Sequence, residues 1–342
     1  MWLRIDQRQV HVMTPNPTYD YIIIGSGIAG LYSALLAMEH GSVLVLTKGS
    51  IQDCNTQYAQ GGIAAAVGPG DSPSNHLDDT LAAGAGLCNR DAARLLAENG
   101  PQAIAELVRL GVTFDTTNGE IALGREAAHG IPRVLHAGGD ATGAQIELTL
   151  ASLARSSRID VREYLTTTGL LLTDDRSCVV GVAGFDSRTG TESKYFGKNT
   201  ILATGGAGQL YRYTTNPGVT TGDGVSLAYN AGAAIMDIEF YQFHPTALCV
   251  PDAPPFLITE AMRGEGAILR NTEGEPFMDR YHPQGDLAPR DVVSRSLLAE
   301  MLATDSNHVL LDATHLPAKL LTTRFPNIYN TCLSHGVDIT AD

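Results

Sequence analysis

The sequence predicts an α/β protein built around a doubly wound parallel sheet, and three observations support this prediction. Residues 21–24 form a short apolar run typical of a buried strand. A glycine-rich turn follows at residues 25–30, and an apolar pattern with helical spacing continues from Leu31 to Met38. A second buried strand is expected at residues 43–46, after Gly41. Strand, glycine turn, helix and strand in this order begin a Rossmann-like dinucleotide-binding unit.

The glycine turn has the spacing of a pyrophosphate-binding loop. Its first glycine permits the tight turn, its second lets a pyrophosphate approach the backbone, and its third lets the helix pack closely on the sheet. The anion would lie at the N-terminus of the helix. A glycine turn without a ligand is the alternative, but the register of strand, turn and helix favours the dinucleotide. The loop consists of Gly25, Ser26, Gly27, Ile28, Ala29 and Gly30.

Composition and length exclude several classes of protein. With 342 residues, the chain is long enough for a large core and for two or more domains. The net charge of −14 argues against nucleic-acid binding. Because no run of about eighteen apolar residues occurs, we expect no contact with a membrane through a spanning helix. The five cysteines form no CxxC pair and the ten histidines show no ligand spacing, which predicts reduced thiols, a cytoplasmic location and no metal site.

The end of the second strand departs from the sequence pattern of proteins that bind a nicotinamide dinucleotide. There, an acidic residue usually binds the ribose hydroxyls, whereas here the strand ends at Thr47 and Lys48. This counts against a plain NAD dehydrogenase and suggests that Lys48 contacts the cofactor in another way. A solvated lysine at the strand end is the alternative. Further on, the loop at residues 55–66 carries Gly61 and Gly62, whose exposed N–H groups can face a pyrophosphate or a flat ring.

Helices and strands alternate along the rest of the chain. The cap residue Asn89, the initiating proline Pro101 and the terminal glycine Gly111 mark helix ends, and apolar runs mark the strands. The expected helices lie at residues 78–85, 90–98, 102–110 and 225–232. The expected strands lie at residues 161–173, 179–186 and 199–206, with residues 195–196 as a hairpin neighbour.

Several motifs, in a fixed order, resemble one family of flavoproteins. They are AQGGIAA at residues 59–65, HAGGDATG at 136–143, ATGG at 203–206, EFYQFHPT at 239–246, TEAMRGEGA at 259–267 and APRDVVSR at 288–295. The set looks like the family of succinate dehydrogenase, fumarate reductase and L-aspartate oxidase. The last three motifs are far more specific than a glycine loop, and the resemblance covers nearly all of residues 19–342.

The resemblance implies FAD as the cofactor and adds a second domain to the predicted fold. After an N-terminal extension at residues 1–18, an FAD-binding domain would span residues 19–238, with an inserted β ribbon near 161–198. An inserted α+β capping domain would fill residues 239–342. Family members continue further, so the second part of the FAD-binding domain and a C-terminal helical domain are expected to be absent. A second substrate histidine and a second arginine lie in that part, so we expect the chain alone to be weakly active or inactive.

The resemblance also implies which residues bind FAD. Relatives that bind flavin covalently usually carry a histidine at the position of Asn55, so a noncovalent flavin is expected. The backbone around Thr166 and Thr167 would touch the adenine end, and Asp223 would contact the flavin. Beyond the glycine turn, the residues assigned to FAD are Lys48, Asn55, Thr56, Gln57, Tyr58, Ala59, Gln60, Gly61, Gly62, Thr166, Thr167, Thr204, Gly205 and Asp223.

A four-carbon dicarboxylate is the substrate that the resemblance implies. Its two carboxylates need cationic and neutral donors, which Arg290, His244 and Thr259 supply. In the family, the arginine at the position of Arg290 delivers a proton to fumarate. Because a guanidinium keeps its proton far above neutral pH, we expect Arg290 to hold a carboxylate and to serve as a proton shuttle. Glu126 would bind the substrate amine, and Glu126 or Glu260 would hold it or take its proton.

Ion pairing is the alternative role for several of these charged residues. Glu126 lies in a loop where Ala127 and Ala128 replace two glycines of the family. Spacing alone would pair Glu126 with Arg125 or Arg133. Two further arginines are expected either to contact the substrate or to form buried ion pairs, Arg263 with Glu260 and Arg295 with Asp291.

Together these features point to the L-aspartate oxidases within the family. The expected reaction oxidises L-aspartate to iminoaspartate, with oxygen or fumarate as acceptor, as the first step of quinolinate and de novo NAD biosynthesis. Quinolinate synthase is the protein partner that this suggests. A soluble flavoprotein of the fumarate reductase or succinate dehydrogenase type is the first alternative, and an inactive flavin-binding fragment is the second.

Overall fold

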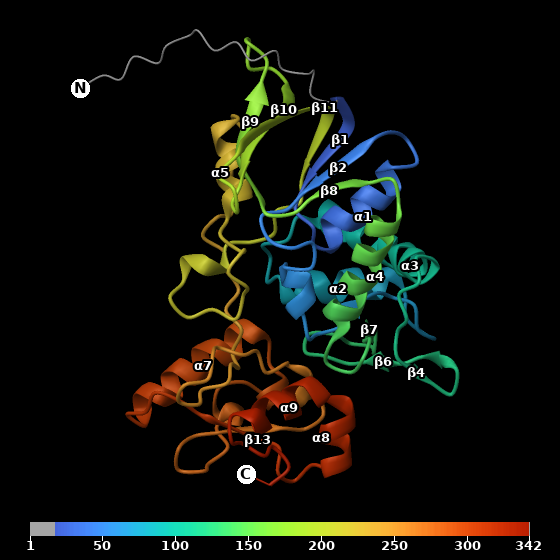
Figure 1. Ribbon diagram of the computed structural model, residues 1–342. Coiled ribbons are helices and arrows are strands. Elements are labelled where there is room, and N and C mark those ends of the chain that lie inside the picture. The colour runs from blue at the N-terminus through green and yellow to red at the C-terminus, as the bar shows by residue number, and fades with distance from the viewer. Residues whose placement is uncertain (1–17, 342) are drawn as a thin grey trace, which may run out of the picture. The chain divides into compact units, whose positions relative to one another are not determined.

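A computed structural model describes residues 18–341 of the chain (Figure 1). The extension predicted for residues 1–18 therefore lies outside the described residues, apart from Thr18, which opens the first strand. The described chain forms two compact units. Unit 1 contains residues 18–54, 150–210 and 218–236, and unit 2 contains residues 55–149, 211–217 and 237–341. The predicted boundary between an FAD-binding domain and a capping domain at residue 238 stays a prediction.

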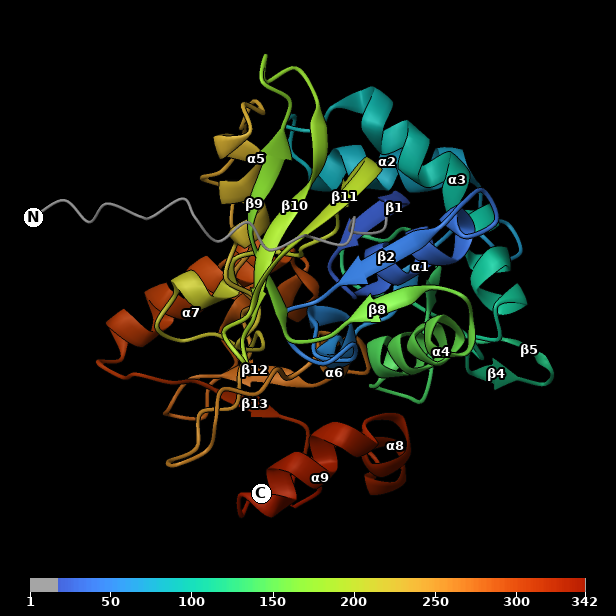
Figure 2. The same cartoon turned by 45° about the horizontal axis from the view of Figure 1, so that its top comes forward.

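Unit 1 is built on a six-stranded mixed sheet (Figure 2). Its strands are β1 Thr18–Ile24, β2 Val43–Leu46, β8 Asp160–Arg162, β9 Leu165–Leu172, β10 Val179–Asp186 and β11 Glu192–Leu202. Their order in the sheet is β8-β2-β1-β11-β10-β9. The strands β8, β2, β1 and β11 run parallel, and β10 and β9 extend the sheet in antiparallel pairing. The predicted α/β fold with a parallel sheet at its centre is confirmed.

The centre of this sheet is buried on both faces. Ile22 and Ile23, which are neighbours on β1 and so point to opposite faces, are both 0% exposed, and all of β2 is buried. Because both faces of a central parallel strand are buried, its sequence is a continuous apolar run. Helix α1, Ile28–Ala37, packs against β1 and β2, and helix α5, Asp223–Asn230, packs against β9.

Two strand boundaries predicted from the sequence are wrong. Residues 161–173 do not form one strand, because Tyr164 adopts a left-handed φ of 61° and separates β8, which pairs with β2, from β9, which pairs with β10. Residues 195–196 and 199–202 belong to one strand, β11, whose first half pairs with β10 and whose second half pairs with β1. Since β11 ends at Leu202, the ATGG motif lies in the loop after the strand.

Unit 2 combines helices with three small sheets. Its helices are α2 Pro73–Ala83, α3 Arg90–Arg109, α6 Ala261–Gly264, α7 Arg290–Ala303, α8 Ala318–Arg324 and α9 Pro326–Ser334, and helix α4, Thr142–Ser156, begins in unit 2 and ends in unit 1. Its strands are β3 Ile63–Ala64, β4 Thr116–Thr117, β5 Glu120–Ile121, β6 Leu123–Gly124, β7 Val134–Leu135, β12 Ile268–Arg270 and β13 Leu310–Asp312. One apolar cluster contains Met262, Phe325 and Ile328, and another contains Phe277 and Val293.

Helix α3 corrects the prediction of two helices at residues 90–98 and 102–110. It runs without interruption from Arg90 to Arg109, with Pro101 inside it. Its buried face, formed by Ala97, Ile104 and Leu107, continues past the proline. Burial of this face on both sides of Pro101 therefore offsets the hydrogen bond that the proline cannot make. The predicted cap is confirmed, since Asn89 Oδ1 accepts hydrogen bonds from the N–H groups of Asp91 and Ala92.

Helix α2 begins at Pro73, earlier than the predicted residue 78. The side chain of Ser72 accepts a hydrogen bond from Asn75 N at 3.2 Å, and proline occupies the first helical position. Both features are ordinary signals of a helix start. Among residues 18–341, no helix is both long and apolar enough to cross a membrane.

Candidate active site

The glycine turn of unit 1 joins β1 to α1. Gly25 has a φ of 114°, and a Cβ at this position would lie 2.1 Å from the carbonyl oxygen of Ala203. A Cβ on Gly30 would lie 2.0 Å from the carbonyl oxygen of Gly25. Both positions therefore require glycine. The buried hydroxyl of Ser26 donates to Thr47 Oγ1 at 3.0 Å, which fixes the turn against the end of β2.

Lys48 is held at the start of α5. Its Nζ lies 2.5 Å from Asp223 Oδ2 and also donates to the hydroxyl of Thr221. That hydroxyl donates in turn to Asp223 Oδ1 at 2.6 Å. Burial raises the pKa of Asp223, but hydrogen bonds from Lys48 and Thr221 outweigh it and keep the pKa below its usual value. Lys48 is therefore an ordered cation rather than a freely solvated one, and its contact with the cofactor stays a prediction.

The neighbouring loops of unit 1 fit an anionic dinucleotide. A Cβ placed on Gly205 or Gly206 would meet no heavy atom within 4 Å, so this backbone is open to a ligand. Thr204 lies closely against the first turn of α5, because a Cβ on Gly224 would be 1.8 Å from its hydroxyl oxygen. Unit 1 thus brings a tight glycine turn, a helix N-terminus, a lysine and exposed glycine backbone to the same end of the sheet, a donor set that suits a pyrophosphate.

Thr166 and Thr167 lie at the start of β9. The preceding residue, Leu165, donates its N–H to the carbonyl oxygen of Thr47 at 2.9 Å, so this strand begins next to the end of β2. Thr167 is 9% exposed, and within the described chain its hydroxyl has no hydrogen-bond partner. The two threonines therefore lie near Lys48 in the fold, and their contact with the adenine end stays a prediction.

The AQGG segment belongs to unit 2. It follows a single 3-10 turn, Asn55–Tyr58, and leads into β3, whereas the sequence predicted a loop over both short elements. Gly143 packs against the segment, since its N–H donates to the carbonyl oxygen of Ala59 at 2.9 Å and a Cβ there would lie 1.9 Å from the Thr56 carbonyl oxygen. A Cβ on Gly61 would meet no heavy atom within 4 Å. Gly61 therefore leaves backbone open to a ligand.

Arg290 and Glu260 form the centre of a charged cluster in unit 2. Arg290, the first residue of α7, donates Nε–H to Glu260 Oε2 and Nη1–H to Gln242 Oε1 at 3.1 Å. Glu260 is 4% exposed, and its Oε2 also lies 3.8 Å from Nη2 of Arg263. Glu260 thus lies between two arginines, and its neighbour Thr259 is buried, with a hydroxyl oxygen 3.4 Å from Ala261 N.

Arg263 and Arg295 differ in their surroundings. Arg263 is 2% exposed and donates Nη1–H to the carbonyl oxygen of Asp286, while burial lowers its pKa against the opposing effects of Glu260 and Asp286. It therefore forms the buried ion pair that was the alternative to substrate contact. Arg295 pairs with Asp291 at 2.7 Å, but both side chains are more than 60% exposed, so this pair lies on the surface.

His244 is neutral near pH 7. Its Nδ1 lies 2.9 Å from the carbonyl oxygen of Thr246. Burial and the positive charges of Arg290 and Arg263 lower the pKa of His244 to about 4, although the Thr246 carbonyl and Glu126 act in the opposite direction. The effects of Arg290 and Glu126 on this imidazole show that the predicted substrate residues lie within electrostatic reach of one another.

Glu126 is a carboxylate in a largely buried position. Its Oε1 lies 3.4 Å from Nε2 of His136, and 13% of its side chain is exposed. Burial raises the pKa of Glu126, but His136, Arg290 and His129 together hold it below the usual value. Glu126 is therefore anionic near pH 7 and can hold an ammonium group.

The predicted alternative partners of Glu126 are engaged elsewhere. Arg125 donates Nε–H to the carbonyl oxygen of His129 at 3.0 Å. Arg133 is buried and pairs with two aspartates, Asp71 and Asp79. Pairing of Glu126 with Arg125 or Arg133 is therefore wrong, because Arg133 has two nearer carboxylates and the Arg125 side chain turns back onto its own loop.

A pocket of about 570 Å³ opens beside Glu126 within unit 2. Its polar lining combines carboxylates, a guanidinium and an imidazole, and small residues form much of the remainder. A pocket of this size, with several charged side chains in its wall, suits a small charged molecule. The lining side chains that matter here are Asp79, Arg125, Glu126, His129 and Gln284.

Sequence reasoning missed the partners of the predicted site residues. His136 lies inside the quoted HAGGDATG motif, which could have marked it as a neighbour of Glu126. Thr221 and Lys48 are 173 residues apart, and neither spacing nor residue type signals their contact. Among residues 18–341, no group of three His, Cys, Asp or Glu side chains is placed to hold a metal ion.

A parallel sheet with a required glycine turn between its central strand and first helix defines a dinucleotide-binding protein. The chain belongs to the family described as FAD binding domain, which matches residues 20–342. FAD is therefore the cofactor of its family, as predicted. The chain is also homologous to L-aspartate oxidases, with 44% identity over 326 residues to the enzyme of Synechocystis sp. and 42% identity over 334 residues to that of Yersinia pestis.

These alignments include 94% of this chain but only 58% of the Synechocystis protein and 62% of the Yersinia protein. The chain thus spans little more than half the length of the curated relatives. Among solved structures, a quinol–fumarate reductase with menaquinol molecules matches with a TM-score of 0.87 and 30% identity, over 94% of this chain and 59% of the other. The Mycobacterium smegmatis Sdh1 complex in the apo form matches with a TM-score of 0.77 and 36% identity, over 95% and 57%.

Proposed function

We propose that this chain forms the part of an L-aspartate oxidase that binds noncovalent FAD and orients L-aspartate for oxidation to iminoaspartate. The observation that supports this most is the anionic Glu126 in the wall of a pocket of unit 2, the unit that also contains the Arg290–Glu260 ion pair. A carboxylate suits the substrate amine, and a guanidinium suits a substrate carboxylate. The 44% identity to an L-aspartate oxidase favours this function over that of a fumarate reductase.

FAD, when bound, supplies the acceptor for two electrons from the substrate. The residues that would hold it are those of the glycine turn, Lys48, Asp223 and the AQGG segment. We propose noncovalent binding because Asn55 lacks the nucleophilic nitrogen that a histidine would offer. Oxygen or fumarate would reoxidise the cofactor, and the product would enter quinolinate synthesis.

Arg290 would bind and orient one substrate carboxylate. Glu260 and Gln242 engage its Nε and Nη1 groups, so the guanidinium is held in one orientation and still has N–H groups to donate. Glu260 is buried beside it and forms an ion pair with its Nε group. This favours the role of Arg290 as a hydrogen-bond donor to a substrate carboxylate. A proton shuttle through Arg290 would operate only in fumarate reduction.

Glu126 and His244 would bind the other polar groups of the substrate, Glu126 its amine and His244 a carboxylate. The amine must lose its proton before the C–H bond can break. Because its pKa is lowered, Glu126 is a weak base that would hold the ammonium, and the proton would pass on through Glu126 or Glu260. His244 is neutral, so it can donate a hydrogen bond to a carboxylate without adding a second charge next to Arg290. Thr259 would supply a further neutral donor, as its hydroxyl can both donate and accept.

An anaerobic single-turnover experiment tests this function and also detects slow chemistry. The chain is loaded with FAD and mixed with L-aspartate, and the flavin absorbance is followed. We expect bleaching with L-aspartate and none with succinate, with at least about a tenfold slower rate in Glu126→Gln. Thr272→Ala, at an exposed residue of unit 2, serves as the control and should match the unsubstituted chain.

The other outcomes separate the alternatives. If L-aspartate leaves the flavin oxidised but fumarate reoxidises a chemically reduced flavin, the chain has the fumarate reductase type of activity. If the chain retains FAD and neither compound reacts, it is a flavin-binding fragment, and the proposed oxidase activity is contradicted for this chain.

A further inference from the structure

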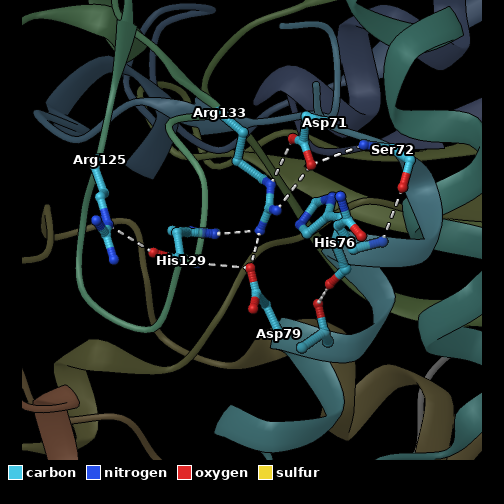
Figure 3. Close-up of polar contacts among 10 residues, drawn as sticks. Asp71, Ser72, His76, Asp79, Arg125, His129 and Arg133 are labelled. Carbon is cyan, nitrogen blue, oxygen red and sulfur yellow. Dashed lines mark hydrogen bonds and ion pairs between the residues drawn. The ribbon is translucent and has the colours of Figure 1, made fainter. Parts of the chain in front are cut away.

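Arg133 is the buried centre of a polar network with Asp71, Asp79 and His129 (Figure 3). Its side chain is 0% exposed, and it forms two parallel hydrogen bonds with Asp71, from Nε at 2.9 Å and from Nη2 at 3.0 Å. Its Nη1 donates to Asp79 Oδ2 at 2.5 Å. Such paired contacts keep a guanidinium charged and fixed in direction.

The same Nη1 group lies 3.1 Å from Nδ1 of His129 (Figure 3). A guanidinium can only donate hydrogen bonds, so Nδ1 of His129 must be the acceptor. A neutral imidazole carries one N–H, and that proton is then on Nε2. Arg133 therefore fixes the tautomer of His129.

The backbone on either side of His129 is held as well. Asp79 Oδ2 accepts the N–H of Gly130 at 2.8 Å in addition to the contact with Arg133. The carbonyl oxygen of His129 accepts Nε–H of Arg125 at 3.0 Å. These contacts fix the backbone from which the imidazole of His129 extends.

The charge of His129 follows from its surroundings. Burial lowers its pKa and so does Arg133, while three carboxylates act in the opposite direction. The net shift is downward, so the imidazole is neutral near pH 7. The carboxylates are Glu126, Asp79 and Glu260, and the ring of His76 lies 6.0 Å away, centroid to centroid.

His129 lines the same pocket as Glu126. We infer that His129 is a further substrate-orienting residue, a neutral imidazole whose Nε2–H donates to a carboxylate of a dicarboxylate ligand while Glu126 binds the amine. Arg133 is then a positioning residue that acts through His129. The identity of the ligand rests on the proposed function, whereas the tautomer follows from the contact with Arg133 alone. A neutral donor at this place has a chemical advantage, because it binds a carboxylate without neutralising Glu126.

Nuclear magnetic resonance of the chain labelled with ¹⁵N-histidine tests the tautomer. Long-range ¹H–¹⁵N spectra distinguish a protonated from an unprotonated ring nitrogen, and the His129→Gln variant assigns the signal. We expect an unprotonated Nδ1 and a protonated Nε2 for His129 at pH 7. A proton on Nδ1, or an imidazolium at this pH, would overturn the inference, and this measurement does not require a functioning oxidase.

Binding of succinate to the FAD-loaded chain tests the contact with a ligand. His129→Leu removes the donor and should raise the dissociation constant of succinate about tenfold to a hundredfold. His129→Gln keeps an amide donor and should stay within about threefold, and His308→Leu, at an exposed histidine, should have no effect. Unfolding curves check that each variant is folded. If His129→Leu does not fold, His129→Gln is compared with the unsubstituted chain instead.

The outcomes distinguish this inference from the proposed function. Equal succinate affinity of the unsubstituted chain, His129→Leu and His129→Gln contradicts the role of His129 but leaves the proposed function intact. If the unsubstituted chain binds no succinate, both the dicarboxylate site and the role of His129 in it are contradicted. A tenfold loss in His129→Leu with recovery in His129→Gln supports the inference, since a purely structural role would not follow the presence of the donor.

Discussion

Lys48 Nζ and Asp223 Oδ2 lie 2.5 Å apart and join the end of β2 to the first turn of α5. The ammonium is held beside the glycine turn, where an anionic cofactor is expected. The two side chains are 25% and 39% exposed, so solvent weakens their attraction. The contact therefore matters more for placing a positive charge than for holding the fold together.

Replacing this lysine should weaken FAD binding far more than stability. We expect Lys48→Gln to raise the dissociation constant of FAD at least about tenfold, because a charge-assisted contact is lost, and to lower the free energy of unfolding by less than about 1 kcal/mol. Flavin fluorescence titration and urea unfolding measure the two effects. Lys198→Gln, which removes another paired lysine of unit 1, is the control and should leave FAD binding unchanged; a similar loss in both variants would argue against a specific role for Lys48.

Gly25 should not tolerate a side chain. An alanine there would place its Cβ 2.1 Å from the Ala203 carbonyl oxygen at a φ of 114°. We expect Gly25→Ala to lower the free energy of unfolding by about 2 kcal/mol or more and to abolish FAD retention. Gly206→Ala is the matched control, because its Cβ would meet no heavy atom within 4 Å. Equal unfolding midpoints for the two variants in urea would contradict the expected clash.

The strand, glycine turn and first helix could be predicted because their determinants are local. The apolar run at residues 21–24 and the glycine spacing lie within one short segment, and each signal supports the same structure. Helix α3 could not be divided correctly, since the rule that proline begins a helix competed with an apolar face that continues beyond Pro101. Burial of the apolar face of α3 therefore outweighed the local effect of Pro101.

The types of residue at the candidate site could be predicted, but their partners could not. Spacing suggested an ion pair between Glu126 and Arg133, yet Arg133 binds Asp71, which is 62 residues away. Contacts over such distances depend on how the chain folds back on itself, and a single sequence carries no measure of that. The resemblance to known flavoproteins supplied roles for Glu126 and Arg290 but not the network that holds them.

His244 should make the free energy of unfolding of the chain depend on pH. Its pKa is lowered from 6.5 to about 4 in the folded chain. The unfolded chain therefore binds this proton at a higher pH than the folded chain, and the contribution to stability is complete above pH 6.5 and is lost as the pH falls toward 4. We expect a loss of about 1 to 3 kcal/mol from this group between pH 7 and pH 4.5.

Urea unfolding at pH 7 and pH 4.5 measures this contribution. In His244→Gln, the drop in the free energy of unfolding between the two pH values should be smaller than in the unsubstituted chain by the amount that His244 contributes. His308→Gln, at an exposed histidine, should keep the full drop. A drop of the same size in His244→Gln would show that His244 does not have a lowered pKa.

Ala128 adopts a left-handed φ of 66° in the loop that carries Glu126. An L residue with a side chain pays about 1 kcal/mol for this conformation, and glycine does not. We expect Ala128→Gly to be more stable than Ala127→Gly by about 1 kcal/mol, because both changes loosen the unfolded chain equally but only the first relieves strain. Urea unfolding of the two variants gives this difference, and a reversed order would exclude strain at Ala128.

Glu260 should be a costly carboxylate to neutralise. Its side chain is 5% exposed, and it is the nearest anion to Arg263, which is itself buried and makes few hydrogen bonds within the described residues. Glu260→Gln keeps the size and a hydrogen-bonding oxygen but removes the nearest carboxylate of the buried Arg263, so that Asp286 is left as its main compensating anion. Removing one partner of a buried pair in this way costs about 3 to 5 kcal/mol.

The surface pair of helix α7 provides the control for this prediction. Asp291→Asn removes a carboxylate from a pair in which both side chains are more than 60% exposed, and it should change the free energy of unfolding by less than about 0.5 kcal/mol. Guanidinium chloride would screen such surface pairs, so urea is the better denaturant for the comparison. If Glu260→Gln and Asp291→Asn cost the same, Glu260 does not compensate a buried charge. The start of α7 and the contact with Gln242, rather than an ion pair, would then hold the Arg290 guanidinium in position.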